Sequence, residues 1–141
     1  MKEHWERVYD EKPVEEMGWY ESSPEPSLRL IEHCSLEKDA AILNVGAGAT
    51  TLVDKLLELG YSQVIANDIS QAALEELQLR LGPELSKKVH WIADDLTEPG
   101  ELYDLGQIDL WHDRAVLHFF HERPSQEAYF ALLKKLVRPG G

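Results

Sequence analysis

Two glycines in a short turn are the first residues of this chain whose type and spacing suggest chemistry. Gly46 and Gly48 lie in the stretch from Ala41 to Thr51, where a short apolar run passes into a helical pattern. Glycine lets the chain turn sharply and lets the backbone approach a ligand closely, and the first N–H groups of a following helix face the same place. The turn therefore predicts a crevice suited to a nucleotide or nucleoside.

An acidic residue follows at the distance that a ribose-binding carboxylate would have. The run from Gln63 to Asn67 reads as a second strand that ends on Asp68, twenty residues after Gly48. An acid that ends the second strand of a βαβ unit can accept both hydroxyls of a ribose. Thr51 stands where a dinucleotide fingerprint has its third glycine, so a nicotinamide-dependent oxidoreductase is not favoured.

Further acidic residues follow two later apolar runs. Asp94 and Asp95 come directly after a predicted strand at 89–93, and Asp113 comes directly after another at 108–112. Residues just beyond the carboxyl ends of parallel strands lie on the edge where open α/β sheets bind ligands. We predict that Asp113 holds an amine nucleophile or, like His112, takes its proton. The alternative is that Asp113 pairs with a neighbouring arginine or caps the following turn.

These residues require a framework of alternating strands and helices. Strand and helix patterns alternate four times along the chain, which predicts an α/β fold with a doubly wound parallel sheet and helices on both faces. Helix starts are predicted where a serine precedes an amphipathic run, at Ser27, Ser70 and Ser125. The connections between strands are then right-handed crossovers.

Composition restricts the class of protein and of partner. The chain has 141 residues, 43% of them hydrophobic, which is enough for one domain with a core. No apolar run approaches the length of a membrane helix, and the first residues lack a signal peptide's apolar region, so a cytoplasmic protein without membrane association is expected. Fourteen basic against 26 acidic residues give a net charge of -12, which disfavours nucleic acid as a partner.

Residues 1–26 form an aromatic segment that precedes the predicted domain at 27–141. Trp19 and Tyr20 are its most closely spaced rings, and prolines interrupt any long helix. One interpretation is a lid that places Trp19 over the ligand crevice; the other is that the rings cover one edge of the sheet. His112, His118 and His121 lack a cysteine partner or an H-E-x-x-H pattern, so no metal site is predicted.

With these features together, the chain resembles the class I methyltransferases that use S-adenosylmethionine. The resemblance covers nearly all of the chain and rests on segments similar to four family motifs: Ile42 to Gly48, Asn67 to Ser70, Trp91 to Leu96 and Leu136 to Gly141. It implies a Rossmann-like fold, S-adenosylmethionine as the cofactor and methyl transfer as the activity. Methyl transfer from a sulfonium depends on in-line positioning more than on a strong base.

The candidate cofactor-binding residues lie at strand ends or in the segment predicted as a lid: Gly46, Ala47, Gly48, Asp68, Ile69, Asp95, Leu96, His112 and Trp19. The glycine turn would pass under the methionine part, and Asp68 would hold the ribose. Asp95 would accept a hydrogen bond from the adenine amino group while the Leu96 backbone N–H reaches the ring. Asp94 is the alternative residue for this bond, because it directly precedes Asp95.

The chain departs from the family pattern at two positions of the first motif. Asn44 stands where the family usually carries an acid, and Thr50 where it often has a third glycine. The amide of Asn44 can still hydrogen-bond. A branch of the family that contains protein-lysine methyltransferases has similar sequences at three segments: 4–9, 18–20 and 109–115. A lysine of a protein substrate is therefore one predicted methyl acceptor. A small molecule is the other.

The resemblance also predicts how much of the sheet is present. A complete class I fold continues beyond the Pro-Gly-Gly turn, so strands in the order 3-2-1-4 are expected here and the remaining C-terminal strands are expected to be missing. The exposed edge of the fourth strand would need a cover, and a second copy of the chain is a predicted partner there. The alternative to an enzyme is a cofactor-binding or interaction module without turnover.

Overall fold

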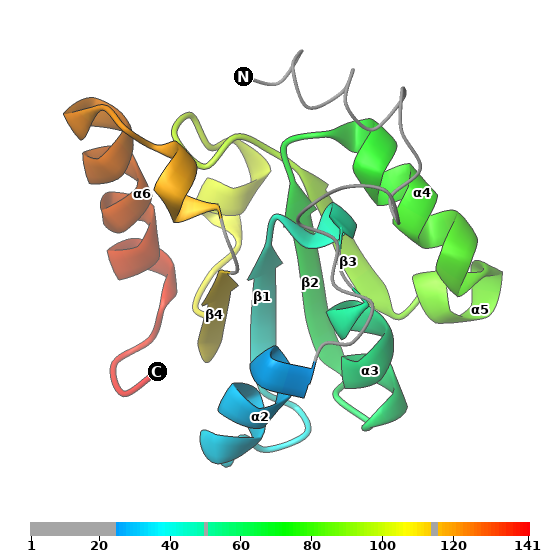
Figure 1. Ribbon diagram of the computed structural model, residues 1–141. Helices are drawn as coiled ribbons and strands as arrows, with labels where there is room; N and C mark the ends of the chain where they lie inside the picture. The colour runs from blue at the N-terminus through cyan, green and yellow to red at the C-terminus, as the bar shows by residue number, and fades with distance from the viewer. Residues whose placement is uncertain (1–24, 50, 114–115) are drawn as a thin grey trace.

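The computed structural model describes residues 25–49, 51–113 and 116–141. Within them lies a four-stranded sheet with the order β3-β2-β1-β4, in which every pair of neighbours is parallel (Figure 1). The strands are β1 (Ala41–Val45), β2 (Gln63–Asp68), β3 (Val89–Ala93) and β4 (Leu110–Asp113). The predicted fold class and strand order are confirmed.

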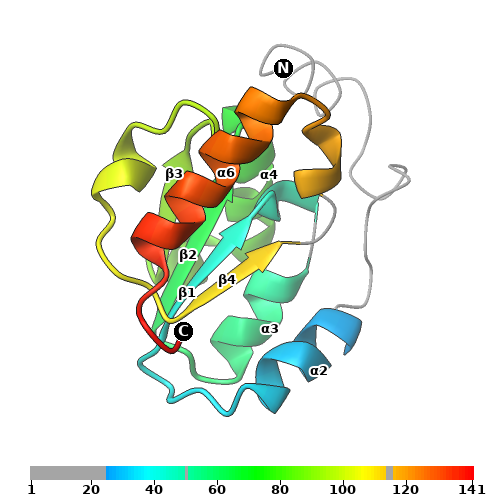
Figure 2. The ribbon, with the colours of Figure 1, turned by 90° about the vertical axis from the view of Figure 1, so that its left-hand side faces the viewer.

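Helices lie on both faces of this sheet. The α-helices are α2 (Glu25–His33), α3 (Leu52–Glu58), α4 (Gln71–Leu81), α5 (Pro83–Ser86) and α6 (Arg123–Leu136). Short 3₁₀ turns occur at η2 (Ala47–Ala49), η3 (Glu101–Asp104) and η4 (Leu117–Phe119). Helices α2, α3 and α4 share one hydrophobic core with the sheet, whereas α6 and η3 share the other (Figure 2).

The alternation of side chains in β1 explains how one strand serves both cores. Ile42 belongs to the core under α2, α3 and α4, whereas Leu43 and Val45, two positions apart on the other face, belong to the core under α6. All three are buried, as expected for a central strand of a parallel sheet covered on both faces.

Only one of the three predicted serine caps is observed. The Ser70 hydroxyl accepts a hydrogen bond from the Ala73 N–H at 3.1 Å and caps α4. The predictions for Ser27 and Ser125 were wrong. Ser27 lies buried inside α2, and α6 begins before Ser125 because Pro124 stands in its first turn, where proline's fixed φ suits a helix start.

The chain that follows α6 adds to the outer side of β4 at its beginning. Ile108 N–H donates to the Leu136 carbonyl at 2.8 Å and Arg138 N–H donates to the Ile108 carbonyl at 3.0 Å, which makes Val137 the parallel partner of Ile108. This part of the predicted exposed edge is therefore covered by the chain itself. Cover by a second copy stays a prediction.

Asp109 ties three segments together at the start of β4. Its Oδ2 accepts a hydrogen bond from the Ala41 N–H at 2.7 Å, and the Arg138 guanidinium donates to Oδ1. Both contacts, the Ala41 bond first, hold the pKa of Asp109 below its ordinary value. A carboxyl group that is more acidic in the folded state stabilises the fold at pH values above its pKa in the unfolded state. This contribution is lost as the pH falls through the pKa in the folded state.

We expect Asp109→Asn to lower the free energy of unfolding by about 1 to 2 kcal/mol at pH 7, because it weakens hydrogen bonds to a charged acceptor. The difference from wild type should shrink below roughly pH 4, where carboxyl groups take up protons. Urea unfolding of wild type and Asp109→Asn at pH values from 7 down to below roughly 4 measures this difference in the free energy of unfolding. Asp104→Asn, at an exposed position, is the control. Parallel curves for wild type and Asp109→Asn at all pH values would contradict the assignment.

Candidate functional site

The register of the sheet brings the strand ends, and several predicted site residues with them, to one edge. Val45, the last residue of β1, is the partner of Asn67 in β2 and of Asp113 in β4, and Asp68 is the partner of Ala93 in β3. The turn after β1, the last residue of β2 and the loop after β3 therefore meet at the carboxyl ends of the strands, toward which the arrowheads point in Figure 1. This is the ligand-binding edge of open α/β sheets.

The glycine turn, Gly46 to Gly48, has no room for side chains at either glycine. Gly46 has a φ of +69°, and a Cβ added to it would lie 2.3 Å from Cγ2 of Val116. A Cβ added to Gly48 would lie 2.5 Å from Cβ of Ala73 and 3.0 Å from Oδ2 of Asp68. The backbone is thus packed closely against Val116 on one side and against α4 on the other.

Asp68 links the glycine turn to the start of α4. Its side chain is buried; Oδ2 accepts a hydrogen bond from the Gly48 N–H and Oδ1 one from the Ser70 N–H, both at 3.0 Å. Ile69, between Asp68 and Ser70, is partly exposed. A carboxylate can accept several hydrogen bonds at once, from backbone and from hydroxyl donors. The group therefore has the chemistry for ribose hydroxyls, which the sequence predicted for it.

The two acids after β3 differ in how they are bonded. Both oxygens of Asp94 bind backbone N–H groups of the following loop: Oδ2 those of Gly100 (2.8 Å) and Leu102 (3.0 Å), and Oδ1 that of Asp95 (3.1 Å). Among the described residues, the Asp95 carboxylate accepts bonds only on Oδ1, from the N–H (2.8 Å) and hydroxyl (2.7 Å) of Thr97. Asp94 thus organises the loop, which favours Asp95 over Asp94 as the candidate for the adenine.

Asp113, the last residue of β4, caps the start of η4. Oδ1 accepts from the Val116 N–H at 2.8 Å, and Oδ2 accepts from the Leu117 N–H at 3.1 Å and from the Tyr129 hydroxyl at 2.6 Å. The capping role was the alternative that the sequence left open. Orientation of an amine by the same carboxylate stays a prediction.

A buried amide in β1 carries an acceptor that nothing in the described part of the chain satisfies. Asn44 is 1% exposed, and its Nδ2 donates to the Ile65 carbonyl at 3.1 Å, but Oδ1 has no hydrogen-bond partner among the described residues. An unpaired buried carbonyl costs about 1 to 3 kcal/mol. A ligand N–H at this edge would relieve that cost, so Asn44 fits a site for a molecule that carries an amino group.

The remaining predicted residues are more scattered. His112 is partly exposed in β4, where it is the strand partner of Asn44, and Leu96 is buried in the core under α6. Trp19 and residues 1–24 of the predicted lid lie outside the described residues. Sequence reasoning missed Asn67, whose buried Nδ2 donates to the carbonyls of Ile92 and Asp94 and fixes the ends of β2 and β3 together.

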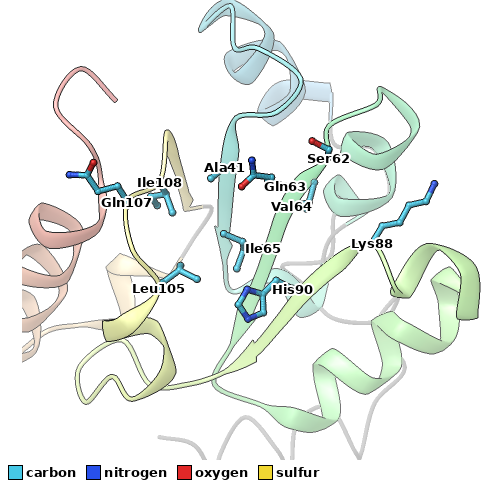
Figure 3. A pocket seen from close by; sticks show the side chains of 10 residues that line it. All are labelled: Ala41, Ser62, Gln63, Val64, Ile65, Lys88, His90, Leu105, Gln107 and Ile108. Atoms are coloured by element: carbon cyan, nitrogen blue, oxygen red, sulfur yellow. The ribbon is translucent and has the colours of Figure 1, made fainter.

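A groove of about 330 Å³ lies at the opposite, amino edge of the sheet (Figure 3). It is lined by Ala41, Ser62, Gln63, Val64, Ile65, Lys88, His90, Leu105, Gln107 and Ile108. Its charged side chains are exposed, and His90 is paired with Glu101 at 3.0 Å. Because it lies at the amino edge, the groove is separate from the predicted site at the carboxyl edge. Among the described residues, no group of His, Cys, Asp and Glu side chains is arranged to hold a metal ion, and no helix is long and apolar enough to cross a membrane.

A parallel sheet of this order with a glycine turn and an acid at neighbouring strand ends defines a nucleotide-binding α/β protein. The family model of the methyltransferase domain matches residues 42–141. The chain belongs to this family, and the predicted membership in the class I methyltransferases that depend on S-adenosylmethionine is confirmed.

Individual proteins that are similar to the chain are also named as methyltransferases. The chain is 26% identical over 153 residues to EEF1A lysine methyltransferase 2 of Danio rerio; the match covers 99% of the chain and 65% of the relative, so the chain spans less than two thirds of that protein's length. A TehB-like SAM-dependent methyltransferase from Corynebacterium glutamicum has the same fold, with a TM-score of 0.62 and 15% identity over 99% of this chain and 68% of that one.

A second solved structure with this fold contains a cofactor product. It is a SAM-dependent methyltransferase from Thiobacillus denitrificans in complex with S-adenosyl-L-homocysteine. Its TM-score to this chain is 0.55, with 19% identity over 88% of this chain and 47% of that one. At these sequence identities the two solved structures establish the fold alone. The match to the family model is what indicates the class of cofactor.

Proposed function

We propose that this chain transfers a methyl group from S-adenosylmethionine to a nitrogen or oxygen nucleophile, and that its acceptor is a protein lysine. The observation that carries the proposal is the meeting of the glycine turn, Asp68 and Asp95 at the carboxyl edge of the sheet. Family membership supports the choice of methyl transfer among the reactions that such an edge serves.

Each of these groups is proposed to bind one part of the cofactor. The glycine turn lies under the methionine part, Asp68 with Ile69 holds the ribose, and Oδ2 of Asp95 with the Leu96 N–H binds the adenine. Oδ1 of Asn44, which has no partner in the described part of the chain, supports an N–H donor at the methionine end. When bound, S-adenosylmethionine supplies an electrophilic methyl group on a sulfonium, and the protein contributes mainly position and orientation.

Asp113 and His112 are proposed to face the acceptor beside the methyl-bearing end of the cofactor. Asp113 already accepts three hydrogen bonds within the chain, and a carboxylate has about four lone-pair sites, so one N–H of an amine can still be held. His112 of the same strand end is the alternative proton acceptor.

The choice of a protein lysine has two supports. The relative from Danio rerio is named as a lysine methyltransferase of EEF1A, and the match extends over 99% of this chain. The net charge of -12 favours the approach of a basic protein surface.

Calorimetric titration with S-adenosylhomocysteine and a radiolabel transfer assay test the proposal together. We expect saturable binding of one molecule per chain and transfer of a labelled methyl group from S-adenosylmethionine to EEF1A as the trial acceptor. Acetylation of the acceptor's lysines should abolish the transfer. Transfer that survives acetylation would contradict lysine, binding without transfer to any acceptor would favour a module without turnover, and absence of binding would contradict the cofactor site.

A further inference from the structure

Tyr129 in α6 carries a hydroxyl group that is buried behind the carboxyl end of β4. The residue is 2% exposed; its hydroxyl donates to Oδ2 of Asp113 at 2.6 Å and accepts from Nε1 of Trp111 at 2.9 Å. Burial, and then the bond to Asp113, raise the pKa of Tyr129 well above its ordinary value. The hydroxyl therefore keeps its proton and remains a donor to the carboxylate.

The ring of Tyr129 is fixed by aromatic neighbours, so the direction of the hydroxyl is fixed as well. The Trp111 ring meets it edge to face, with centroids 5.3 Å apart, and the Phe120 ring lies at 5.8 Å. Phenylalanine would fill nearly the same volume and keep these ring contacts. A buried hydroxyl is costly unless it is bonded, so packing alone does not account for tyrosine at this position.

The hydroxyl is connected to the glycine turn through two further contacts. Asp113, held by Tyr129, binds the N–H groups of Val116 and Leu117 and so fixes the start of η4. The Val116 side chain in turn lies against Gly46, where an added Cβ would come within 2.3 Å of it. The contacts Tyr129–Asp113, Asp113–Val116 and Val116–Gly46 thus connect α6 to the glycine turn.

We propose that Tyr129 is a positioning residue of the cofactor site, which acts through Asp113 to hold Val116, at the start of η4, against the glycine turn. The proposal rests on the proposed function, because it assumes that S-adenosylmethionine binds at this turn. Tyr129 does not itself touch the cofactor; it sets the shape of the wall that the cofactor meets. Such preorganisation raises affinity by lowering the cost of ordering on binding.

The test is the affinity for S-adenosylhomocysteine of Tyr129→Phe, measured by calorimetry well below the unfolding temperature of every variant. We expect roughly 5- to 10-fold weaker binding, because Val116 and Leu117 are then held less firmly and must be ordered when the ligand binds. Tyr103→Phe is the matched control, since it removes the same atom from a half-exposed tyrosine whose ring contacts Lys135, and its affinity should equal that of wild type. A residue important only for stability would lower the unfolding temperature and leave the affinity unchanged.

A second variant and a second measurement examine the same connection from its other end. Asp113→Asn, which weakens the bond to the Tyr129 hydroxyl, should reduce affinity to a similar extent, and adding Tyr129→Phe to it should have little further effect. Hydrogen exchange at the amides of Val116 and Leu117 should become faster in both single variants.

The outcomes separate this inference from the proposed function. Wild-type protein that does not bind S-adenosylhomocysteine overturns both. Wild-type protein that binds it, with equal affinity in Tyr129→Phe, overturns the positioning role alone. Fully additive effects of the two substitutions also overturn it, because independent sites do not share a connection.

Discussion

Replacement of Asp68 by alanine is expected to weaken the binding of S-adenosylhomocysteine by roughly 10- to 100-fold, the equivalent of losing hydrogen bonds to a charged acceptor. Two effects act together. The proposed bonds to the ribose hydroxyls are lost, and the N–H groups of Gly48 and Ser70 lose the acceptor that aligns the glycine turn with α4.

Asp68→Asn separates these two effects. The asparagine oxygen can still accept one of the two backbone N–H groups, whereas the charge and one acceptor for the ribose are gone. We expect it to lose most of the affinity with a smaller loss of stability than alanine causes. Asp54→Asn is the control, because Asp54 lies on α3 and pairs with Arg80 at 2.7 Å. An affinity within twofold of wild type for Asp68→Ala, measured by calorimetry, would contradict the ribose assignment.

The sheet could be predicted because its strands are marked on the sequence itself. β1, β2 and β3 are short apolar runs bounded by turn residues, and their observed limits agree closely with the predicted ones. β4 begins at Leu110, two residues later than predicted, because the backbone of Ile108 is bonded to the chain after α6. An apolar run shows that a segment is buried, but it does not show which neighbour pairs with it.

The helix starts also show how far a local sequence pattern determines the structure. Ser70 follows a strand and precedes an amphipathic run with no competing signal, and it caps α4 as predicted. At α6 two start signals lie next to each other, Pro124 and Ser125, and the proline decides where the helix begins. A serine next to a proline is therefore a weaker signal for a cap than a serine alone.

The candidate site was predictable where sequence spacing determines spatial position. The strand ends place Asp68 beside the glycine turn, and a bond from the Gly48 N–H to its carboxylate follows from that register. Asp94 and Asp95 could not be distinguished, because both directly follow β3 and only the path of the next loop determines which carboxylate it uses. The bond between Asp113 and Tyr129 joins residues that are 16 positions apart, and no local pattern indicates it.

The second large effect is expected for Gly48→Ala. The new methyl group would lie 2.5 Å from Cβ of Ala73 and 3.0 Å from Oδ2 of Asp68, so α4 or the glycine turn must move. Overpacking of this kind costs about 1 to 3 kcal/mol of stability. Because the same shift separates the Gly48 N–H from Asp68, we also expect at least roughly tenfold weaker binding of S-adenosylhomocysteine.

A compensating substitution makes this prediction specific. Ala73→Gly removes the methyl group that the new one would meet, so the double variant Gly48→Ala with Ala73→Gly should regain part of the affinity lost in Gly48→Ala. Gly60→Ala is the control: Gly60 has a φ of +93° with no heavy atom within 4 Å of an added Cβ, so alanine there strains the backbone without a clash. It should lower the unfolding temperature and leave the affinity unchanged. Equal losses of affinity in Gly48→Ala and Gly60→Ala would mean that general destabilisation, and not the close approach of the glycine turn to α4 and Asp68, limits cofactor binding.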